Sequence, residues 1–259
     1  MKISVISRWR DEAFFAPFFL NHYSLFADEI IIKLDNHTTD NTLSVLKNYP
    51  KVRYEFFESW GRIDNNLYAN MMSQLAWYLD SDWVFYVDAD ELIFPFDSIW
   101  LNYDSVRFTL SHVKPEENII IANLNWVYKH NSEHPLNPNN LPLPQRRHGA
   151  SYKLAKGYYE NQAIVMRKPS IVRPSAKVQW MAGQHDYVKA PHLVESSIEF
   201  NGAHWQMADV ENAIHRTIPR SQECNRSETD KINGWGQRNL TEEDIRKECE
   251  SHLNDPQII

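Results

Sequence analysis

The stretch Trp83-Val84-Phe85-Tyr86-Val87-Asp88-Ala89-Asp90-Glu91-Leu92 carries the most informative pattern in this sequence of 259 residues. Five apolar or aromatic residues come first, and such a short continuous run is typical of a strand that is buried on both faces of a sheet. Three carboxylates follow within four positions. Because alternate side chains of an extended chain lie on the same side, we expect Asp88 and Asp90 to point the same way.

Two neighbouring carboxylates at the end of a buried strand repel each other unless a cation lies between them. A hard divalent ion such as Mg²⁺ or Mn²⁺, which prefers oxygen ligands and bridges to phosphate oxygens, fits this position. The same residues also fit a strand that runs out into an acidic surface turn, because short acidic motifs recur by chance. The residues that precede the motif favour the metal site.

The first ninety residues alternate between strand and helix patterns. The expected strands are residues 3–7, 29–34, 52–57 and 83–87, and the helices between them include residues 65–79, with Leu67, Met71, Leu75 and Leu79 as the buried stripe. Such alternation indicates an α/β fold with a mostly parallel, Rossmann-like central sheet flanked by helices. In that architecture ligands bind outside the carboxyl ends of the strands, where the strand order switches.

Polar clusters follow three of the expected strands, at residues 8–12, 35–40 and 88–91. A parallel sheet would bring these clusters to one edge. No glycine-rich phosphate loop follows any strand, and the chain has only 7 Gly, so neither a P-loop nor a dinucleotide fingerprint is present. Phosphate groups would therefore have to be held by a metal ion and by side chains.

These three clusters resemble motifs of the GT-A fold glycosyltransferases, and most closely those of the family-2-like bacterial group. The matching segments are Arg8-x-x-Asp11-Glu12, Leu34-Asp35-Asn36-x-x-x-Asp40-Asn41-Thr42 and Val87-Asp88-Ala89-Asp90-Glu91-Leu92. The family pattern has Asn in place of Asp11, Gly in place of Asn41 and Phe in place of Leu92. It also has Ser where Thr38 or Thr39 stands here. The resemblance covers about the first hundred residues well and the remainder loosely.

The resemblance implies a metal-dependent glycosyltransferase that takes a nucleotide sugar as donor, with a UDP-sugar as the expected one. Asp88 and Asp90 would bind Mn²⁺ or Mg²⁺ and, through it, the diphosphate. Asp35 would hydrogen-bond the base or ribose, and Arg8 and Glu12 would line the nucleotide pocket. Alternatives from the residues alone are a surface ion pair for Arg8 and Glu12, and helix-cap chemistry for Asp40.

A late histidine often completes the metal shell in this family, and two histidines follow small residues here, His185 in Gly183-Gln184-His185 and His204 in Gly202-Ala203-His204. Either would suit Mn²⁺, and either could instead be a partly buried structural histidine. A catalytic base would be a carboxylate such as Glu91 or Asp186. Glu91 would equally serve to support the metal carboxylates.

The chain is expected to form one GT-A domain, with residues 1–100 as the nucleotide-sugar half and residues 101–259 as the acceptor-side half. In the second half we expect strands at residues 119–127, 162–167 and 194–200, and a long loop at residues 129–150 over the site. Helices are expected around residues 210–218 and 241–253.

Composition limits the partners. The net charge of −7 argues against nucleic acid, and two cysteines with no signal-like or membrane-spanning run indicate a cytoplasmic protein, with attachment at the inner face of a membrane left open. The expected acceptor is a glycan or a lipid-linked sugar, as in surface polysaccharide or lipopolysaccharide synthesis. The aromatic content of 13% weakly favours a carbohydrate ligand, because aromatic side chains commonly contact sugar rings.

Two other functions fit the same sequence. A non-catalytic carbohydrate-binding protein would use tryptophans such as Trp60, Trp126, Trp180 and Trp205 and would need neither metal nor nucleotide. A metal-dependent nucleotidyltransferase would also use paired carboxylates on a sheet edge, and it would release pyrophosphate.

Overall fold

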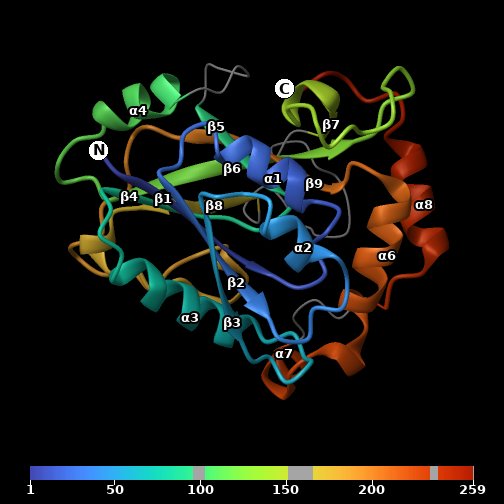
Figure 1. Ribbon diagram of the computed structural model, residues 1–259, viewed down its shortest axis with the longest axis horizontal. Helices are drawn as coiled ribbons and strands as arrows, with labels where there is room; N and C mark the ends of the chain where they lie inside the picture. Colours follow the sequence, from blue (N-terminus) through green and yellow to red (C-terminus); the bar gives the residue numbers. More distant parts are fainter. Residues whose placement is uncertain (96–102, 151–165, 234–238, 259) are drawn as a thin grey trace.

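The computed structural model describes residues 1–95, 103–150, 166–233 and 239–258. One sheet runs through the middle of the molecule, in the order β3-β2-β1-β4-β8-β6-β9-β5, with β7 paired to β6 (Figure 1). Its strands are β1 (Ile3–Trp9), β2 (Glu29–Asp35), β3 (Val52–Phe57), β4 (Trp83–Tyr86), β5 (Glu91–Pro95), β6 (Ile119–Tyr128), β7 (His148–Ala150), β8 (Arg167–Val172) and β9 (Phe200–Met207).

The first four strands form the parallel part of the sheet. β1 lies between β2 and β4, and β3 continues outward from β2, with every one of these pairs parallel. The chain therefore builds outward from β1 in one direction and then returns to its other side with β4. This reversal is the switch in strand order at which open α/β sheets bind ligands, and the α/β prediction is confirmed.

Both faces of the parallel part are covered. On one face Val5, Ile30 and Ile32 pack with the aromatic residues of α1 (Ala16–Tyr23). On the other face Ile6 and Ile31 pack against α3 (Asn65–Trp77). Successive side chains of a strand therefore pack into the hydrophobic cores on opposite faces of the sheet, which explains the unbroken apolar runs of β2 and β4. Pro17 lies in the first turn of α1, where a missing N–H costs no helix hydrogen bond.

The buried face of α3 differs from the predicted stripe. Its buried residues are Tyr68, Ala69, Met72, Ser73 and Ala76, whereas Leu67, Met71, Leu75 and Leu79 are only partly buried. The small residues let the helix approach the sheet closely, and the larger leucines pack along its margins. The four-residue repeat was real, but it marked the edge of the buried face.

The second half of the sheet is mixed. β8 runs antiparallel to β4 and β6, β5 runs antiparallel to β9, and β6 runs parallel to β9. The prediction at residues 119–127 is confirmed by β6. The predicted strand at 194–200 is wrong, because β9 begins only at Phe200. Of the predicted strand at 162–167, residues 162–165 lie outside the described residues, and the observed strand β8 starts at Arg167.

The remaining helices lie around the sheet. They are α2 (Thr42–Leu46), α4 (Tyr103–Ser111), α6 (Val210–Ser221), α7 (Glu228–Ile232) and α8 (Glu242–Ser251). α6 and α8 lie side by side at one end of the molecule, as Figure 1 shows, and share a small core with Tyr128 and Met207. Both helices were predicted, and Thr241 caps α8 in a capping box with Asp244.

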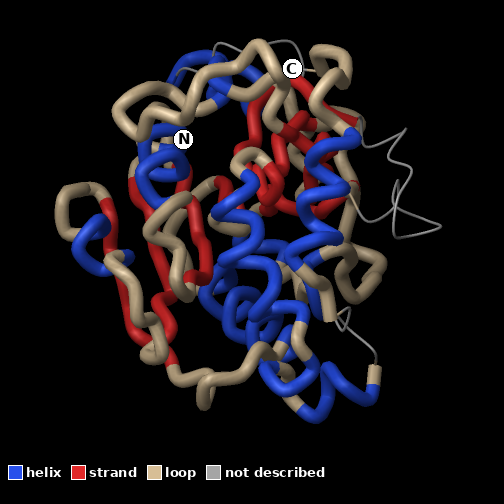
Figure 2. Tube along the Cα trace, turned by 90° about the vertical axis from the view of Figure 1, so that its right-hand side faces the viewer, coloured by secondary structure: helices blue, strands red, loops and turns tan. Residues whose placement is uncertain are grey.

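Figure 2 gives the side view, in which helices and strands interleave within one body. Among the described residues, none of the helices has both the length and the apolar character that a membrane span requires.

Candidate functional site

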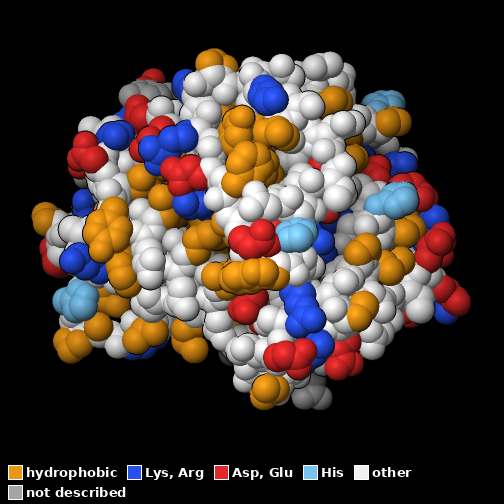
Figure 3. Space-filling model, turned by 60° about the horizontal axis from the view of Figure 1, so that its bottom comes forward, with side chains coloured by type: hydrophobic (Ala, Val, Ile, Leu, Met, Phe, Trp, Pro, Cys, Tyr) orange, Lys and Arg blue, Asp and Glu red, His pale blue; other side chains and the backbone are white. Residues whose placement is uncertain are grey.

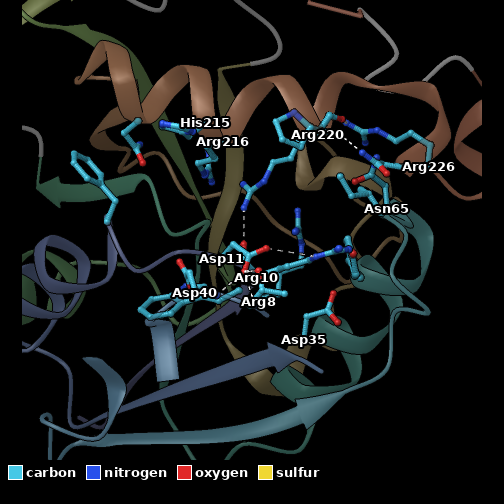
Figure 4. A pocket seen from close by; sticks show the side chains of 18 of the residues that line it. Arg8, Arg10, Asp11, Asp35, Asp40, Asn65, His215, Arg216, Arg220 and Arg226 are labelled. Atoms are coloured by element: carbon cyan, nitrogen blue, oxygen red, sulfur yellow. Dashed lines mark hydrogen bonds and ion pairs between the residues drawn. The ribbon is translucent and has the colours of Figure 1, made fainter. Parts of the chain in front are cut away.

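A pocket of about 630 Å³ opens at the carboxyl ends of β1, β2 and β3 and is closed from the other side by α6 and the segment that follows it. Figure 4 shows arginines from α6 facing residues from the strand ends across this space. The lining is rich in charge: Arg8, Arg10, Arg216, Arg220 and Arg226 face Asp11, Asp35 and Asp40, with Tyr68, Phe57, Asn65, Asn212 and His215 among the other lining residues. The wall presents five arginines and three aspartates, and Arg8, Arg216 and Arg220 also contact carboxylates that lie behind it.

On the strand side, Arg8 and Asp35 each present an unpaired atom. Asp35 is fully buried, and its Oδ1 accepts a hydrogen bond from the backbone N–H of His37 at 2.9 Å. Its Oδ2 is buried and has no partner within the described parts of the chain, and the same holds for Nε of Arg8. The Arg8 guanidinium lies 4.2 Å from the centre of the Tyr68 ring, which fixes its position. Both residues line the pocket, and their contact with a nucleotide stays a prediction.

On the helix side, Arg216 and Arg220 lie one turn apart on α6, so they share a face. Behind them Glu12, only 3% exposed, accepts from Arg216 Nε at 3.1 Å and from Arg220 Nη2 at 2.6 Å. The prediction that Glu12 lines the pocket is therefore corrected: this carboxylate lies beneath the surface and aims the two arginines. Its pairing is a buried ion network, not the surface pair that was the alternative.

The carboxylates of Asp11 and Asp40 hold the loops of the pocket wall. Asp11 Oδ1 accepts from the backbone N–H of Thr39 at 2.6 Å, and Asp40 accepts from the backbone N–H groups of Ala13 and Thr42 at 2.9 Å each. These bonds join the loop after β1 to the loop after β2. The capping role that was the alternative for Asp40 thus accounts for both of its oxygens.

The acidic motif itself forms a tight turn. Residues 88–90 lie between β4 and β5, and the backbone N–H of Glu91 donates to the carbonyl of Asp88 at 3.1 Å. The extended chain expected at Asp88 and Asp90 is not observed, because the backbone turns between β4 and β5. β5 itself was not predicted, since its apolar run is short and follows the carboxylates directly.

Basic side chains pair with every carboxylate of this turn. Lys168, at the start of β8, donates to Glu91 Oε1 and lies 3.3 Å from Asp88 Oδ2. Arg216 Nη1 donates to Asp90 Oδ2 at 2.6 Å, and Arg8 Nη2 lies 3.5 Å from Asp88 Oδ1. The turn is therefore neutralised from both sides by the protein itself.

These pairs change the acidity of both aspartates. Burial alone would raise the pKa of the Asp88 carboxyl, but Lys168 and Arg8 outweigh it and lower that pKa to about 2. Burial opposes ionisation of Asp90 as well, and there Arg216 and His204 hold the pKa well below its usual value. Glu91, followed by Asp88, raises the pKa of Lys168 against the effect of its burial. The charged forms of Asp88, Asp90 and Lys168 are therefore favoured at neutral pH.

As arranged, the turn does not offer a site for a divalent ion. Within the residues that the structure describes, no three His, Cys, Asp or Glu side chains converge as metal ligands. Each aspartate already contacts cationic groups, Asp88 with Lys168 and Asp90 with Arg216. A metal ion would have to displace both, so we derive no step through it.

The two candidate histidines lie in different surroundings. His204, in β9, places Nε2 at 3.3 Å from Asp90 Oδ2, and its ring meets that of Trp126 edge-on at 4.3 Å. His185 follows Gln184, whose buried amide donates to the carbonyl of Tyr86 at the end of β4. His204 is thus beside the acidic turn, as the prediction required. Metal binding by either histidine stays a prediction.

Neither candidate base reaches the pocket. Glu91 is fully buried, and its carboxylate is used by Lys168 and by the backbone N–H of Asp88 at 3.0 Å. Asp186 is exposed on a loop and pairs with Lys189 at 3.2 Å. A general base must contact the acceptor hydroxyl, so the position of Glu91 fits the supporting role that was its alternative, and Asp186 has no access from its present place.

The long loop predicted over the site lies elsewhere. None of the described pocket-lining residues comes from 129–150. Instead Asn131 and Gly149 donate backbone hydrogen bonds to Leu253 and Pro256 near the carboxyl terminus, and Asn21 of the α1 region contacts the loop at Pro138. In Figure 1 the loop is at the top, beside the carboxyl-terminal end, with α7 on the opposite side of the molecule.

Sequence reasoning missed Lys168, Arg216 and Arg220. The two arginines carry a usable signal, since they lie four residues apart on an amphipathic helix whose apolar face was recognised. Lys168 carries none, because a single lysine before an apolar run is common on strands. In the face shown in Figure 3, basic and acidic side chains are interspersed, so the surface there gives no further guide to a ligand.

No protein-family model matches the chain, and no curated protein matches its sequence. Solved structures with partial similarity include S. aureus TarS with UDP-GlcNAc, which is 14% identical over 98% of this chain and 72% of that chain, with a TM-score of 0.42. A 4-diphosphocytidyl-2C-methyl-D-erythritol synthase is 9% identical over 68% of this chain and 77% of that chain, with a TM-score of 0.35.

A third is glucosyl-3-phosphoglycerate synthase from Mycobacterium tuberculosis with Mn²⁺, UDP and phosphoglyceric acid. It is 16% identical over 48% of this chain and 43% of that chain, with a TM-score of 0.29. Similarities this low carry no argument about activity, substrate or metal. The α/β assignment rests on the sheet itself.

Proposed function

We propose that this chain is a glycosyltransferase that binds a nucleotide sugar in the pocket at the carboxyl ends of β1, β2 and β3. One observation carries the proposal: the pocket wall holds buried hydrogen-bond donors and acceptors that have no partner among the residues that the structure describes. Oδ2 of Asp35 is an unpaired acceptor, while Nε of Arg8 and Nδ2 of Asn212 are unpaired donors. Buried polar groups are rarely left unpaired, so a ligand that supplies both partners is expected.

A nucleoside diphosphate supplies both. A base N–H or ribose hydroxyl can donate to Asp35, and phosphate oxygens can accept from Arg8, Asn212 and Arg220. Arginine suits this task because its planar group forms paired hydrogen bonds with phosphate. The pocket, at about 630 Å³, lies within the usual range of small-molecule sites.

In the proposed reaction the bond between the anomeric carbon and the β-phosphate oxygen breaks, and a new bond forms between that carbon and an acceptor oxygen. The acceptor proton passes to a base or to solvent, and the nucleoside diphosphate leaves. Arginines aimed at the diphosphate would stabilise the negative charge that develops on it. We assign the base neither to Glu91 nor to Asp186, because neither lines the pocket.

The finer assignments rest on the sequence resemblance. They are a UDP-sugar as donor, a glycan or lipid-linked acceptor, and a role in surface polysaccharide or lipopolysaccharide synthesis. The resemblance also implies Mn²⁺ or Mg²⁺ held by Asp88, Asp90 and a late histidine. The pairing of Asp88 with Lys168 and of Asp90 with Arg216 does not fit that ion, so no step of the proposed reaction depends on it.

The proposal is tested by thermal unfolding with UDP, GDP, CMP and dTDP, each with and without Mn²⁺, and with free oligosaccharides. A ligand present at a hundred times its dissociation constant stabilises the folded state by about 2.7 kcal/mol, which is readily seen. We expect one nucleotide to stabilise the protein and so to identify the donor base. Stabilisation by oligosaccharides alone would instead support the carbohydrate-binding protein.

A further inference from the structure

The acidic turn and the pocket are separated by arginines. Arg216 lines the pocket and donates to Asp90 at 2.6 Å, and Arg8 lines the pocket and lies 3.5 Å from Asp88. None of the carboxylates of residues 88–91 is itself part of the pocket wall. An anion in the pocket therefore meets guanidinium groups first, with the aspartates behind them.

The charges of this region balance within the protein. Four carboxylates, Glu12, Asp88, Asp90 and Glu91, contact four cations, Arg8, Lys168, Arg216 and Arg220. Lys168 and Glu91 are almost completely buried, so their pairing is shielded from water. These four carboxylates are thus already neutralised by cations of the protein. They have little net negative charge with which to attract a divalent ion, whose usual ligands are carboxylate oxygens.

The arginines still have donors to offer. Both hydrogen bonds described for Arg220 are made by Nη2, one to Glu12 and one to the carbonyl of Arg10 at 2.8 Å. Among the described residues its Nε and Nη1 have no hydrogen-bond partner, and the side chain is 30% exposed at the pocket. Burial and the neighbouring Arg216 lower the pKa of Arg220, which means that they disfavour its positive charge. An anion beside the guanidinium would offset this effect.

We propose that Arg8, Arg216 and Arg220 bind the diphosphate of the nucleotide directly and that Lys168 neutralises the acidic turn, so that these residues take the place of a divalent metal ion. Nucleoside diphosphate binding is then independent of metal. This inference rests on the proposed function for the identity of the ligand.

The test is a calorimetric titration of the full chain with UDP, GDP, CDP and dTDP, once in EDTA and once in Mn²⁺, and with inorganic pyrophosphate in EDTA. We expect at least one nucleoside diphosphate to bind with equal affinity in both conditions, and pyrophosphate to bind without metal. Manganese alone, followed by the electron paramagnetic resonance signal of the free ion, is expected not to bind.

Variants identify the groups responsible. Arg220→Met is expected to weaken nucleoside diphosphate binding in EDTA about tenfold to a hundredfold, because it removes charged hydrogen bonds. It leaves Glu12 paired with Arg216, so the fold is retained. Arg246→Met is the matched control, since Arg246 lies on α8 and pairs with Glu211 and Glu242 outside the pocket. This control is expected to bind as the wild type does.

Each contrary result has its own meaning. Binding that appears only with Mn²⁺, or binding in EDTA that Arg220→Met does not weaken, overturns the metal-independent site and leaves the proposed function in place. Absence of binding by all four nucleoside diphosphates and by pyrophosphate in every condition overturns the proposed function and this inference together.

Discussion

The acidic turn at residues 88–91 and the arginine pair of α6 use charge in opposite ways. Two carboxylates of the turn are buried, with Asp90 only 2% exposed and Glu91 fully buried, and Asp88 is partly exposed. All three are paired within the protein. Arg220 keeps donors toward the pocket while its partner Glu12 lies behind it. The most conspicuous motif of the sequence thus supports the site, and a less conspicuous helix faces the ligand.

The two regions meet at one contact, between Arg216 and Asp90. This contact explains why they depend on each other: the aspartate aims the arginine, and the arginine permits the aspartate to be buried. Removing one partner of a buried ion pair leaves an uncompensated charge, which costs more than the pair contributes. Perturbing the turn should therefore change stability first, and perturbing the pocket wall should change binding first.

Lys168→Met should have the largest effect on stability. It leaves Glu91, which has no access to water, without its cation, and we expect the free energy of unfolding to fall by about 3–5 kcal/mol. Chemical denaturation measures this loss. The double variant Lys168→Met/Glu91→Gln removes both charges and should recover much of it. Equal losses in the single and double variants would show that the pair does not act as a unit.

Asp35→Asn should separate binding from stability. The amide keeps the shape and the acceptor for the N–H of His37, but it presents a donor where the ligand is expected to donate. Nucleoside diphosphate affinity should therefore fall about tenfold, the typical effect of one hydrogen bond to a charged group. Unfolding should change little.

Asp40→Asn is the contrasting variant. Asp40 lines the same pocket, but its oxygens accept from the backbone of Ala13 and Thr42. We expect a modest loss of stability and little change in calorimetrically measured affinity. A stronger effect on binding than that of Asp35→Asn would contradict the roles given to the two aspartates.

Acid should weaken the turn within a defined pH range. The pKa of Asp88 is lowered to about 2 in the folded protein, whereas an unfolded aspartate has a pKa of about 3.9. The stabilisation is therefore complete above roughly pH 4 and is lost as the pH falls toward 2. The free energy of unfolding, obtained from denaturation curves at each pH, should fall less steeply across this range in Asp88→Asn than in the wild type. Identical pH profiles for variant and wild type would exclude a stabilising role for the ionised Asp88.

Local patterns predicted the parallel half of the fold well. β1, β2 and β4 are largely buried and rich in apolar residues, and the helices between the strands repeat with helical period, so these elements could be recognised from their own residues. β3 is only partly buried. β5, β8 and β9 were missed or misplaced because antiparallel partners far along the chain set their limits. Glu91, for example, pairs with His204, more than a hundred positions later.

The site was only partly predictable for the same reason. Arg8 and Asp35 lie at the carboxyl ends of β1 and β2, which could be located approximately from the sequence, and both line the pocket. Glu12 and Asp88 were recognised as charged groups at strand ends, but their partners on α6 and β8 decide that they serve as supports. A carboxylate pair in sequence does not reveal which cation will neutralise it.

The most direct test of the proposed function is ³¹P NMR of the reaction of the wild type with the nucleotide sugar that it binds, run in ¹⁸O-labelled water. Because the acceptor is unknown, water takes its place, and the reaction followed is hydrolysis of the nucleotide sugar. We predict release of a nucleoside diphosphate with unlabelled phosphorus, because the bond at the anomeric carbon breaks. Release of a nucleoside monophosphate and a sugar phosphate, or of label bound to phosphorus, would contradict glycosyl transfer in this pocket.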